Sequence, residues 1–333
     1  MATRAWLVAF LAPVICAASV PVTLENFVRA ETDVYMARLG KTGLGRFEPR
    51  REPASIDHQD VVRMNRDTLY TSAVFDLDAA PVTIVLPDAG KRFLSMQVIN
   101  EDHYTVDVVY RPGRYTYRRD QVGTRYVFVL VRILVNPEDP ADLRLVNALQ
   151  DAIRVEQAQT GTWEVPDWDP VSQGKIRDAL ATLGAMRGDD SGALFGSKAE
   201  VDPVLHLIGT AIGWGGNPRS DAVYLSNYPA QNDGKAAYVL TVKDVPVDGF
   251  WSISVYNAKG FFEKNPDGLY SLNSLTAKPN ADGSRTVQFG GDRNLAPNWL
   301  PIMPGWNYTV RLYRPRQSIL DGKWKFPEAV LMH

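Results

Sequence analysis

The sequence predicts a mainly β protein of the α+β class, in which a helical insert separates two strand-rich parts. Short runs of β-branched and aromatic residues alternate with turn residues over about residues 71–135, and the pattern returns over about residues 222–313. Between these parts, three Asp-Pro pairs each begin an apolar pattern with helical spacing. Short strands at this spacing favour antiparallel sandwiches or barrels over parallel βαβ units.

The composition supports a sizeable core and gives no sign of a nucleic-acid partner. The 333 residues are 45% hydrophobic, which is enough for two cores or for one large β-rich domain. Lysine and arginine together number 36 against 38 acidic residues, and the basic residues are scattered along the chain. Because nucleic-acid binding needs clustered positive charge, we expect no nucleic-acid partner.

Residues 1–18 have the pattern of a secretory signal peptide. Arg4 supplies the positive charge, residues 5–15 form an apolar core, and small residues end the segment at Ala18. The apolar run is too short to span a bilayer, so we expect a periplasmic or secreted protein without stable membrane insertion after cleavage. Cys16 is the only cysteine and would leave with the signal, which excludes disulfides and thiolate chemistry in the mature chain.

A helix followed by strands is expected in the first part of the mature chain. Residues 23–39 have an apolar helical face, with Thr23 as the N-cap and Gly40 just beyond the last turn. Residues 41–59 are charged and rich in proline and glycine, which is typical of a surface connection. The strands expected after it are residues 72–77, 82–86, 93–99, 105–110 and 126–135.

The middle of the chain is expected to be helical and the last third to be β-rich. Asp139, Asp169 and Asp202 each precede a proline, which is the pattern of an N-cap followed by proline at the first helical position. We therefore expect residues 137–219 to be a helical connecting region. The strands expected beyond it are residues 222–225, 236–242, 250–257, 286–289 and 308–313.

A polar cluster at the start of the first expected strand is the leading candidate for a site. Asn65, Arg66, Asp67, Thr68 and Tyr70 lie within six residues, directly before an apolar run. A carboxylate beside a guanidinium can recognise an anion, so the cluster could form the floor of a polar pocket. Alternatively, these side chains bond their own backbone and shape the entry into the strand, which is the commoner role of such clusters.

A second cluster, Glu101-Asp102-His103-Tyr104, follows another expected strand. Two carboxylates beside an imidazole can act as general acid and base, or can offer part of a metal site. In extended backbone Glu101 and His103 point to one side, and Asp102 and Tyr104 to the other. An Asp-His pair in a turn is also common without catalysis.

The other histidines and the glycine-rich stretch at residues 213–218 favour structural roles. His206 lies on an apolar helical pattern, His58 in a polar loop and His333 at the chain end, without the spacing of a zinc site. The glycine-rich stretch follows a helix, whereas a phosphate-binding glycine loop follows a strand. We interpret it as a tightly packed loop with Trp214 buried, and a mobile lid is the alternative. We therefore expect no metal and no cofactor.

Aromatic and small polar residues alternate along the expected strand at residues 250–257. Ser252, Ser254 and Tyr256 share one face with Phe250, while Trp251 faces the core. Small polar residues flanked by aromatics suit a cavity for sugars or ring-bearing ligands, and a solvated surface is the alternative.

Several longer stretches carry a family resemblance. They are NRDTLYTSAVFDLDA, KRFLSMQVINEDHY, GTRYVFV, DPVLHLIGTAIGWGGNP, VPVDGFWSISVYNAKGFF and WLPIMPGWNYTVRLYRPR, with GKWKFPE near the end. Together they resemble exported bacterial proteins that pair domain-of-unknown-function family 1254, near the N-terminus, with family 1214, near the C-terminus. The resemblance covers nearly the whole mature chain. It implies two jelly-roll-like antiparallel β-sandwich units with helices between them.

The resemblance also implies which residues would meet at one site, with the alternative that several of them only hold the two units together. His58 departs from the family pattern, because an amide side chain is expected at that position. The signature positions are Asn65, Arg66, Asp67, Tyr70, His103, Trp214, Asn217, Trp251, Tyr256, Asn257 and Arg311.

The sequence thus predicts four segments and leaves several functions open. The segments are a signal peptide (1–18), a helix plus β-sandwich unit (19–136), the helical connecting region (137–219) and a jelly-roll-like unit (220–333). Our first hypothesis is a non-catalytic exported protein that binds a small molecule or glycan in a cleft between the β units, or that serves the cell envelope. A homo-oligomer is compatible with such a fold, although no residue demands it.

The alternative is a hydrolase that acts on an ester, glycoside or amide. Asp67, or the pair of Asp102 and His103, would then serve as acid and base. Arg66 or Arg311 would stabilise developing negative charge. These groups must converge on one point for this to work. A third hypothesis is a divalent-metal site that uses Glu101 and Asp102, the latter also being a candidate ligand contact.

Overall fold

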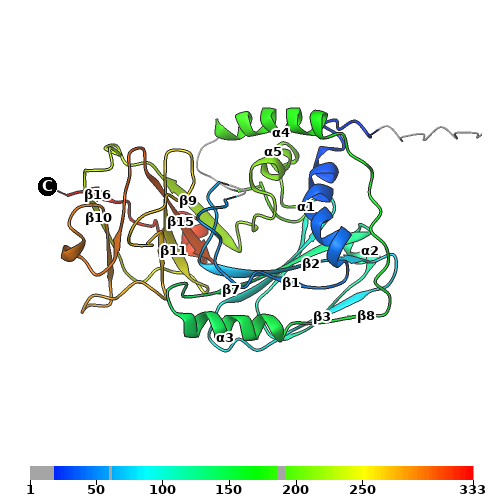
Figure 1. Ribbon diagram of the computed structural model, residues 1–333, viewed down its shortest axis with the longest axis horizontal. Coiled ribbons are helices and arrows are strands. Elements are labelled where there is room, and N and C mark those ends of the chain that lie inside the picture. The colour runs from blue at the N-terminus through cyan, green and yellow to red at the C-terminus, as the bar shows by residue number, and fades with distance from the viewer. Residues whose placement is uncertain (1–18, 60–61, 187–191, 333) are drawn as a thin grey trace, which may run out of the picture.

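The computed structural model describes residues 19–59, 62–186 and 192–332, which form two β-rich units placed side by side (Figure 1). The strand pairs are antiparallel, apart from one short parallel pair in the second unit. The mainly β, α+β class predicted from the sequence is therefore confirmed. The expected signal peptide and Cys16 lie outside the described residues, so export stays a prediction.

A five-stranded sheet is the centre of the first unit. Its central strands are buried along almost their whole length, because both faces of the sheet are covered. In sheet order, the strands are β1 (Glu48–Pro49), β2 (Thr68–Asp76), β7 (Tyr126–Leu134), β4 (Leu94–Asn100) and β5 (Thr105–Val109).

A smaller sheet and a helix cover one face of this sheet. The helix is α3 (Pro140–Asp151), and the short helix α2 (Arg119–Val122) precedes β7. The first hydrophobic core lies between the two sheets and includes Phe75, Ile84, Met96 and Val129. In order, the strands of the smaller sheet are β6 (Gly113–Tyr117), β3 (Val82–Leu86) and β8 (Arg154–Gln157).

Three helices cover the opposite face (Figure 1). Met36 and Leu39 of α1 pack against the sheet, together with Val74 and Phe128. The outer side of α1 packs against the pair formed by the other two helices. These helices are α1 (Phe27–Gly43), α4 (Pro170–Ala185) and α5 (Pro203–Gly213).

The three Asp-Pro helix starts form as predicted. The carboxylate of Asp139 accepts one backbone N–H of the first turn, and those of Asp169 and Asp202 accept two each. The first helix differs at both ends, because it begins at residue 27 and not at residue 23, and it continues past Gly40 to Gly43. The backbone N–H of Thr23 donates to the side chain of Asn26, and residues 24–26 form a turn before the helix.

The second unit is a sandwich of two four-stranded sheets. Between them lies a core that includes Phe289, Trp306, Tyr308 and Leu312. One sheet contains β14 (Trp299–Leu300), β13 (Arg285–Phe289), β10 (Tyr238–Val242) and β16 (Val330–Leu331). The other contains β12 (Ser271–Asn273), β11 (Trp251–Tyr256), β15 (Asn307–Tyr313) and β9 (Ala222–Asn227). Two short helical turns are η1 (Arg293–Leu295) and α6 (Gln317–Leu320).

The segment 137–219, expected as a helical connecting region, belongs to the first unit. It contributes to both faces of the five-stranded sheet. α3 packs on the first core and β8 pairs with β3, so residues up to 157 continue the first unit. β6 and β8 were not expected, because Gly113 reads as part of a turn and the four residues of β8 are too few for a clear period.

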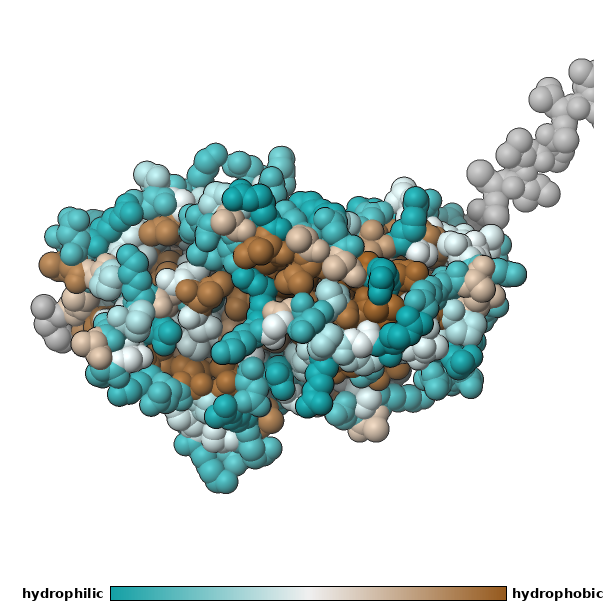
Figure 2. Space-filling view, turned by 90° about the horizontal axis from the view of Figure 1, so that it is seen from below, coloured by the Kyte–Doolittle hydropathy of each residue, from teal (hydrophilic) through white to brown (hydrophobic). Residues whose placement is uncertain are grey.

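The surface carries no broad apolar area on the face shown in Figure 2. Hydrophilic side chains there surround small apolar areas. Within the described ranges, no helix is both long enough and apolar enough to cross a membrane.

Candidate functional site

The segment 62–67 lies against the second unit and is the start of the candidate site. The outward face of the sheet β12-β11-β15-β9 is polar, because inward side chains such as Ile253 and Val310 form the core. The outward side chains are nevertheless buried, and buried polar groups require hydrogen-bond partners. They are Ser252, Ser254, Asn273, Asn307, Thr309 and Arg311.

Arg63 of this segment forms hydrogen bonds with three side chains of the second unit. Its Nη1 donates to the Oδ1 of Asn307 at 2.9 Å and to the Oγ1 of Thr309 at 2.8 Å, and its Nη2 donates to the hydroxyl of Tyr228 at 2.6 Å. Its φ of 54° lies in the left-handed region, which a non-glycine residue adopts only when its surroundings fix it. Sequence reasoning missed Arg63, and only its place beside the polar cluster could have drawn attention to it.

Arg311, on β15 of the second unit, donates a hydrogen bond to the segment 62–67. Its guanidinium donates to Ser254 Oγ at 2.9 Å, to the Tyr256 hydroxyl at 2.6 Å and to the backbone carbonyl of Arg63 at 2.8 Å. The Tyr256 hydroxyl donates in turn to the carbonyl of Met64 at 2.7 Å. Two residues of the predicted site therefore hold the backbone of the segment 62–67.

Asp67 is fully buried beneath this contact. Its Oδ1 accepts a hydrogen bond from Asn273 Nδ2 at 3.2 Å. The hydroxyl of Ser252 lies beside the same carboxylate. Burial raises the pKa of Asp67, and the charge of Arg311 opposes the rise.

Asn65 links both units through tyrosine hydroxyls. Its Nδ2 lies 3.2 Å from the hydroxyl of Tyr70 on β2 and 3.0 Å from that of Tyr313 on β15. Its Oδ1 accepts the backbone N–H of Asp67 at 2.8 Å, which fixes the turn into β2. The polar cluster thus shapes the strand entry and joins the units at the same time.

Arg66 points away from Asp67 toward the neighbouring loops. It donates to the backbone carbonyl of Ala54, and its guanidinium lies 5.2 Å from the ring centre of Tyr270. The guanidinium therefore packs on an aromatic face and is not presented as a free anion receptor.

His103 is a buried, neutral residue with both ring nitrogens in use. Thr210 Oγ1 donates to the carbonyl of His206, so it accepts at 2.8 Å from His103 Nδ1, which carries the proton. His103 Nε2 then accepts the backbone N–H of Gly215 at 2.9 Å. Burial lowers the pKa of His103 to about 3, with a smaller contribution from His206. A histidine fixed in this way has no open nitrogen for proton transfer.

Asp67 and His103 lie at opposite ends of the five-stranded sheet. Asp67 precedes Thr68, which pairs with Leu134, whereas His103 follows Asn100, which pairs with Val127. Seven residues of β7 separate these pairs, which is about 23 Å at ~3.3 Å per residue. The acid–base pair of the hydrolase hypothesis therefore does not form in this structure.

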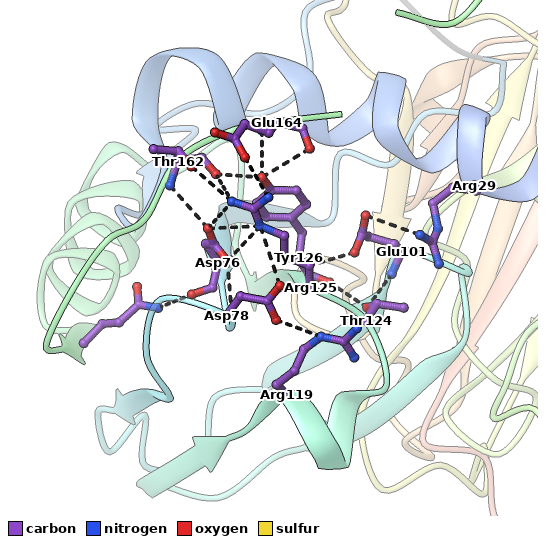
Figure 3. A network of polar contacts seen from close by, with 11 residues as sticks. Arg29, Asp76, Asp78, Glu101, Arg119, Thr124, Arg125, Tyr126, Thr162 and Glu164 are labelled. Atoms are coloured by element: carbon purple, nitrogen blue, oxygen red, sulfur yellow. Dashed lines mark hydrogen bonds and ion pairs between the residues drawn. The ribbon is translucent and has the colours of Figure 1, made fainter. Parts of the chain in front are cut away.

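Glu101 and Asp102 are occupied by structural contacts, and Figure 3 shows those of Glu101. Glu101 Oε2 accepts the backbone N–H of Tyr126 at 2.8 Å, and its Oε1 lies 3.7 Å from Arg29. Asp102 Oδ1 lies 2.5 Å from Nη2 of the same arginine. One guanidinium thus neutralises both carboxylates that the metal hypothesis required.

The glycine-rich loop after α5 is packed onto the sheet. Trp214 stacks on His103, with 5.5 Å between ring centres, and on Tyr35 with 4.6 Å. A Cβ at Gly216 would lie 2.5 Å from the ring of Phe195, so the close packing requires glycine there. The loop continues to the second unit.

The remaining predicted residues have separate positions. Asn217 Nδ2, in the same loop, donates to the hydroxyl of Tyr224 on β9 at 2.8 Å. Trp251 belongs to the core of the second unit and packs on Phe326. Asn257 Oδ1 accepts two backbone N–H groups of its own turn. Trp251 and Asn257 therefore do not face a common site with the polar cluster.

A cavity of about 310 Å³, which we call the inter-unit pocket, opens beside the polar cluster. Its wall from the first unit is residues 136–138, and β12 with the residues around η1 form the wall of the second unit. Asn273 lines it and also bonds Asp67, so the pocket adjoins the segment 62–67. The lining residues that matter for binding are Asn136, Glu138, Ser271, Asn273, Arg293 and Trp299.

Two families match parts of the chain, in the order that the resemblance predicts. Residues 44–120 match the family described as "Protein of unknown function (DUF1254)". Residues 222–317 match the family described as "Protein of unknown function (DUF1214)". None of the curated proteins matches the sequence.

Two solved structures share the fold. The VPA0106 protein from Vibrio parahaemolyticus is similar with a TM-score of 0.72 and 18% identity, over 93% of this chain and 98% of that chain. An uncharacterised protein from Burkholderia cenocepacia is similar with a TM-score of 0.51 and 14% identity, over 88% of this chain and 84% of that chain. At these identities the likeness concerns the fold alone.

Proposed function

We propose that this protein, which pairs an N-terminal DUF1254 module with a C-terminal DUF1214 module, binds a small uncharged carbohydrate in the inter-unit pocket. The observation that carries the proposal is a cavity of about 310 Å³ whose walls come from both units. This volume is at the lower end of the range for small-molecule sites, about 300–1,000 Å³.

The chemistry of the lining supports a polyhydroxylated ligand. Glu138 contributes an exposed carboxylate from the first unit, and Arg293 contributes a guanidinium from the second. Groups of this kind bond vicinal hydroxyls, and the hydroxyl of Ser271 adds a further polar contact. The half-buried indole of Trp299 supplies the apolar wall that a sugar ring needs.

The charges of the lining favour a ligand without net charge. Glu138 and Arg293 have opposite signs, so the pocket offers no excess of either. Arg293 is also ion-paired with Asp267, which reduces its attraction for a free anion. The hydrolase alternative gains no support, because Asp67 and His103 do not meet.

The contacts of the segment 62–67 support a pocket that exists before the ligand arrives. They hold the two units against one another beside the pocket. A preformed site avoids the entropic cost of closing two walls around a ligand.

Titration calorimetry with a panel of neutral mono- and disaccharides tests the proposal. Ser271→Trp should abolish binding, because the indole would fill the pocket and the Ser271 hydroxyl makes no hydrogen bond within the described residues. Glu138→Ala should weaken binding about three- to ten-fold, the loss expected for a hydrogen bond to a charged group. Glu52→Ala is the matched control, because Glu52 is exposed and does not line the pocket.

Two outcomes would reject the proposal. One is a panel in which no sugar binds while amino acids or other zwitterions do, which would assign the facing charges to a different ligand class. The other is a sugar whose affinity is the same in Ser271→Trp and in the wild-type protein.

A further inference from the structure

A second cavity, of about 570 Å³, lies at the edge of the second unit. We call it the edge cavity. It opens between β9 and the segment 322–328, which connects α6 to β16. Its position is distinct from the inter-unit pocket, because the two share no lining residue.

The walls of the edge cavity are mostly apolar and belong to the sandwich core. Val223 of β9 and Leu312 of β15 point into the core, and Leu225 packs against it. Trp324 and Phe326 close the cavity from the segment 322–328. The cavity is therefore a surface recess whose apolar wall is part of the hydrophobic core. Burying apolar surface contributes about 25 cal/mol per Å² of favourable free energy, so a ligand with an apolar body would be stabilised in this cavity.

Charged residues stand at the two ends of the edge cavity. Arg219 Nη2 donates to the carbonyl of Leu320 at 3.2 Å, which places it at the α6 end. Glu328 precedes Ala329, whose N–H donates to the hydroxyl of Tyr308 at the opposite end of β9. Arg219 and Glu328 thus lie toward different ends of the cavity.

Lys325 supplies a second positive charge to the lining. Its side chain is exposed, and it makes no hydrogen bond or ion pair with any of the residues that the structure describes. It is thus a cation of the lining without a partner among the described residues, and Glu328 is the one carboxylate of the lining. An apolar recess with this rim complements a molecule that has an apolar body and one negative charge.

We propose that the edge cavity binds an aliphatic monocarboxylate. The chain lies among the core side chains, and the carboxylate lies toward Arg219 and Lys325. Glu328 repels the carboxylate from the other end, so the ligand has one orientation, and the same charge disfavours a ligand with a second anionic group. This proposal does not depend on carbohydrate binding in the inter-unit pocket.

Calorimetric titration with decanoate, decanol and decylammonium, each below its micelle concentration, tests the head group. Decanoate should bind more tightly than the alcohol and the amine. Lys325→Gln should weaken decanoate about two- to five-fold, the effect of a partly exposed ion pair, and should leave decanol unchanged. Lys323→Gln is the matched control, because Lys323 pairs with Asp321 at 2.8 Å and does not line the cavity.

A filling variant tests the location. Leu225→Trp should abolish decanoate binding, whereas Leu183→Trp, at an exposed position of α4, should not. Circular dichroism must confirm that both variants are folded. If Leu225→Trp does not fold, a bromine-labelled decanoate gives an independent readout, because bromine quenches a tryptophan only in contact. Trp324→Phe should remove most of this quenching while calorimetry still detects binding.

The proposal is overturned if decanoate does not bind, if decanol binds equally well, or if Trp324→Phe leaves the quenching unchanged. Ser271→Trp keeps the edge cavity intact, so decanoate should bind this variant as it binds the wild-type protein. A loss in that variant would place the decanoate in the inter-unit pocket and would contradict two separate sites.

Discussion

Arg311 illustrates how single residues keep charge inside this fold. It is only 3% exposed, yet its donors reach two side chains and the backbone of the segment 62–67. Asp67 lies close enough to oppose its charge. A buried charge is tolerated only when hydrogen bonds and an opposite charge surround it.

Arg311→Lys should destabilise the protein even though it keeps the charge. A lysine offers one compact ammonium and cannot reach Ser254, Tyr256 and the backbone together. We expect a loss of about 3 kcal/mol in the free energy of unfolding, measured by urea denaturation. Arg316→Lys, at an exposed pair with Asp248, should change it by less than about 1 kcal/mol. Equal effects of the two variants would contradict this role of Arg311.

His103 should make the folded state sensitive to acid. Its pKa is about 3 in the folded protein and ~6.5 in the unfolded chain, so the folded state binds fewer protons between these values. The stability that neutral His103 contributes is complete above pH ~6.5 and is lost as the pH falls through this window, by up to about 1.4 kcal/mol per pH unit.

The pH dependence of the overall stability does not isolate His103, because Asp33 changes the stability with pH in the opposite direction. Burial raises the pKa of Asp33 to about 7, so its contribution is present at low pH and lost as the pH rises through that value. NMR should show a constant His103 ring signal from pH 8 to 5. His103→Gln should reduce the acid sensitivity of unfolding relative to the His58→Gln control. A His103 signal that titrates near pH 6.5 would contradict the buried neutral ring.

At the scale of elements, the helix starts depend on local chemistry. Asp202 accepts the N–H groups of Val204 and Leu205, at 2.9 and 3.0 Å, and Pro203 needs no partner at the first position. These bonds satisfy donors that a helix terminus otherwise leaves open.

Asp202→Ala should lower the free energy of unfolding by about 0.5–2 kcal/mol, because the cap is lost. Asp202→Asn keeps an acceptor oxygen and should lose much less. Thermal unfolding of the three proteins checks this, and an alanine variant as stable as wild type would show that packing alone holds α5.

Two glycines should respond to the same substitution with opposite signs. Gly216→Ala would push a Cβ against the ring of Phe195 and should destabilise the protein. Gly174→Ala lies in the interior of α4, where a Cβ meets nothing within 4 Å, and should stabilise it by about 0.5–1 kcal/mol. A melting temperature that moves in the same direction for both would contradict the packing of the loop.

The elements that the sequence predicts well are those with a strong local signal. Strand 82–86 coincides with β3, and each Asp-Pro pair begins a helix. β12, β14 and β16 have only two or three residues, and no period can be read from such lengths. Their places are set by pairing with longer strands that lie far away in the sequence.

The candidate site is harder to predict because distant segments build it. Arg63 and Asn307, which are 244 residues apart, share a hydrogen bond, and no local pattern marks either as its partner. The sequence did select Asn65, Asp67 and Arg311, which the structure brings together. It also grouped His103 with them, although the register of the strands places it at the far end of the sheet.

At the scale of the whole molecule, the segment 62–67 couples the two units. Its side chains and backbone bond residues of β11, β12 and β15. Each unit has its own core, and a small apolar cluster that includes Leu134 and Phe250 also spans the two. The polar contacts at this segment should therefore add to the coupling that makes the units unfold together.

Arg63→Ala should weaken this coupling, because it removes three side-chain hydrogen bonds to the second unit. Calorimetry should show one unfolding transition for the wild-type protein and a broader or double transition for the variant. Arg46→Ala, at an exposed side chain of the first unit, should leave the single transition unchanged. A single, unshifted transition in Arg63→Ala would indicate that the units are joined by other contacts.

NMR mapping of a bound saccharide tests the central proposal most directly. Titration of the isotope-labelled protein with a sugar that binds should shift the backbone amides of residues 138 and 271–276 together, because one ligand touches both units in the inter-unit pocket. The indole N–H of Trp299 should shift with the same dissociation constant. Shifts confined to one unit, or shifts located away from these residues, would contradict a carbohydrate site between the units.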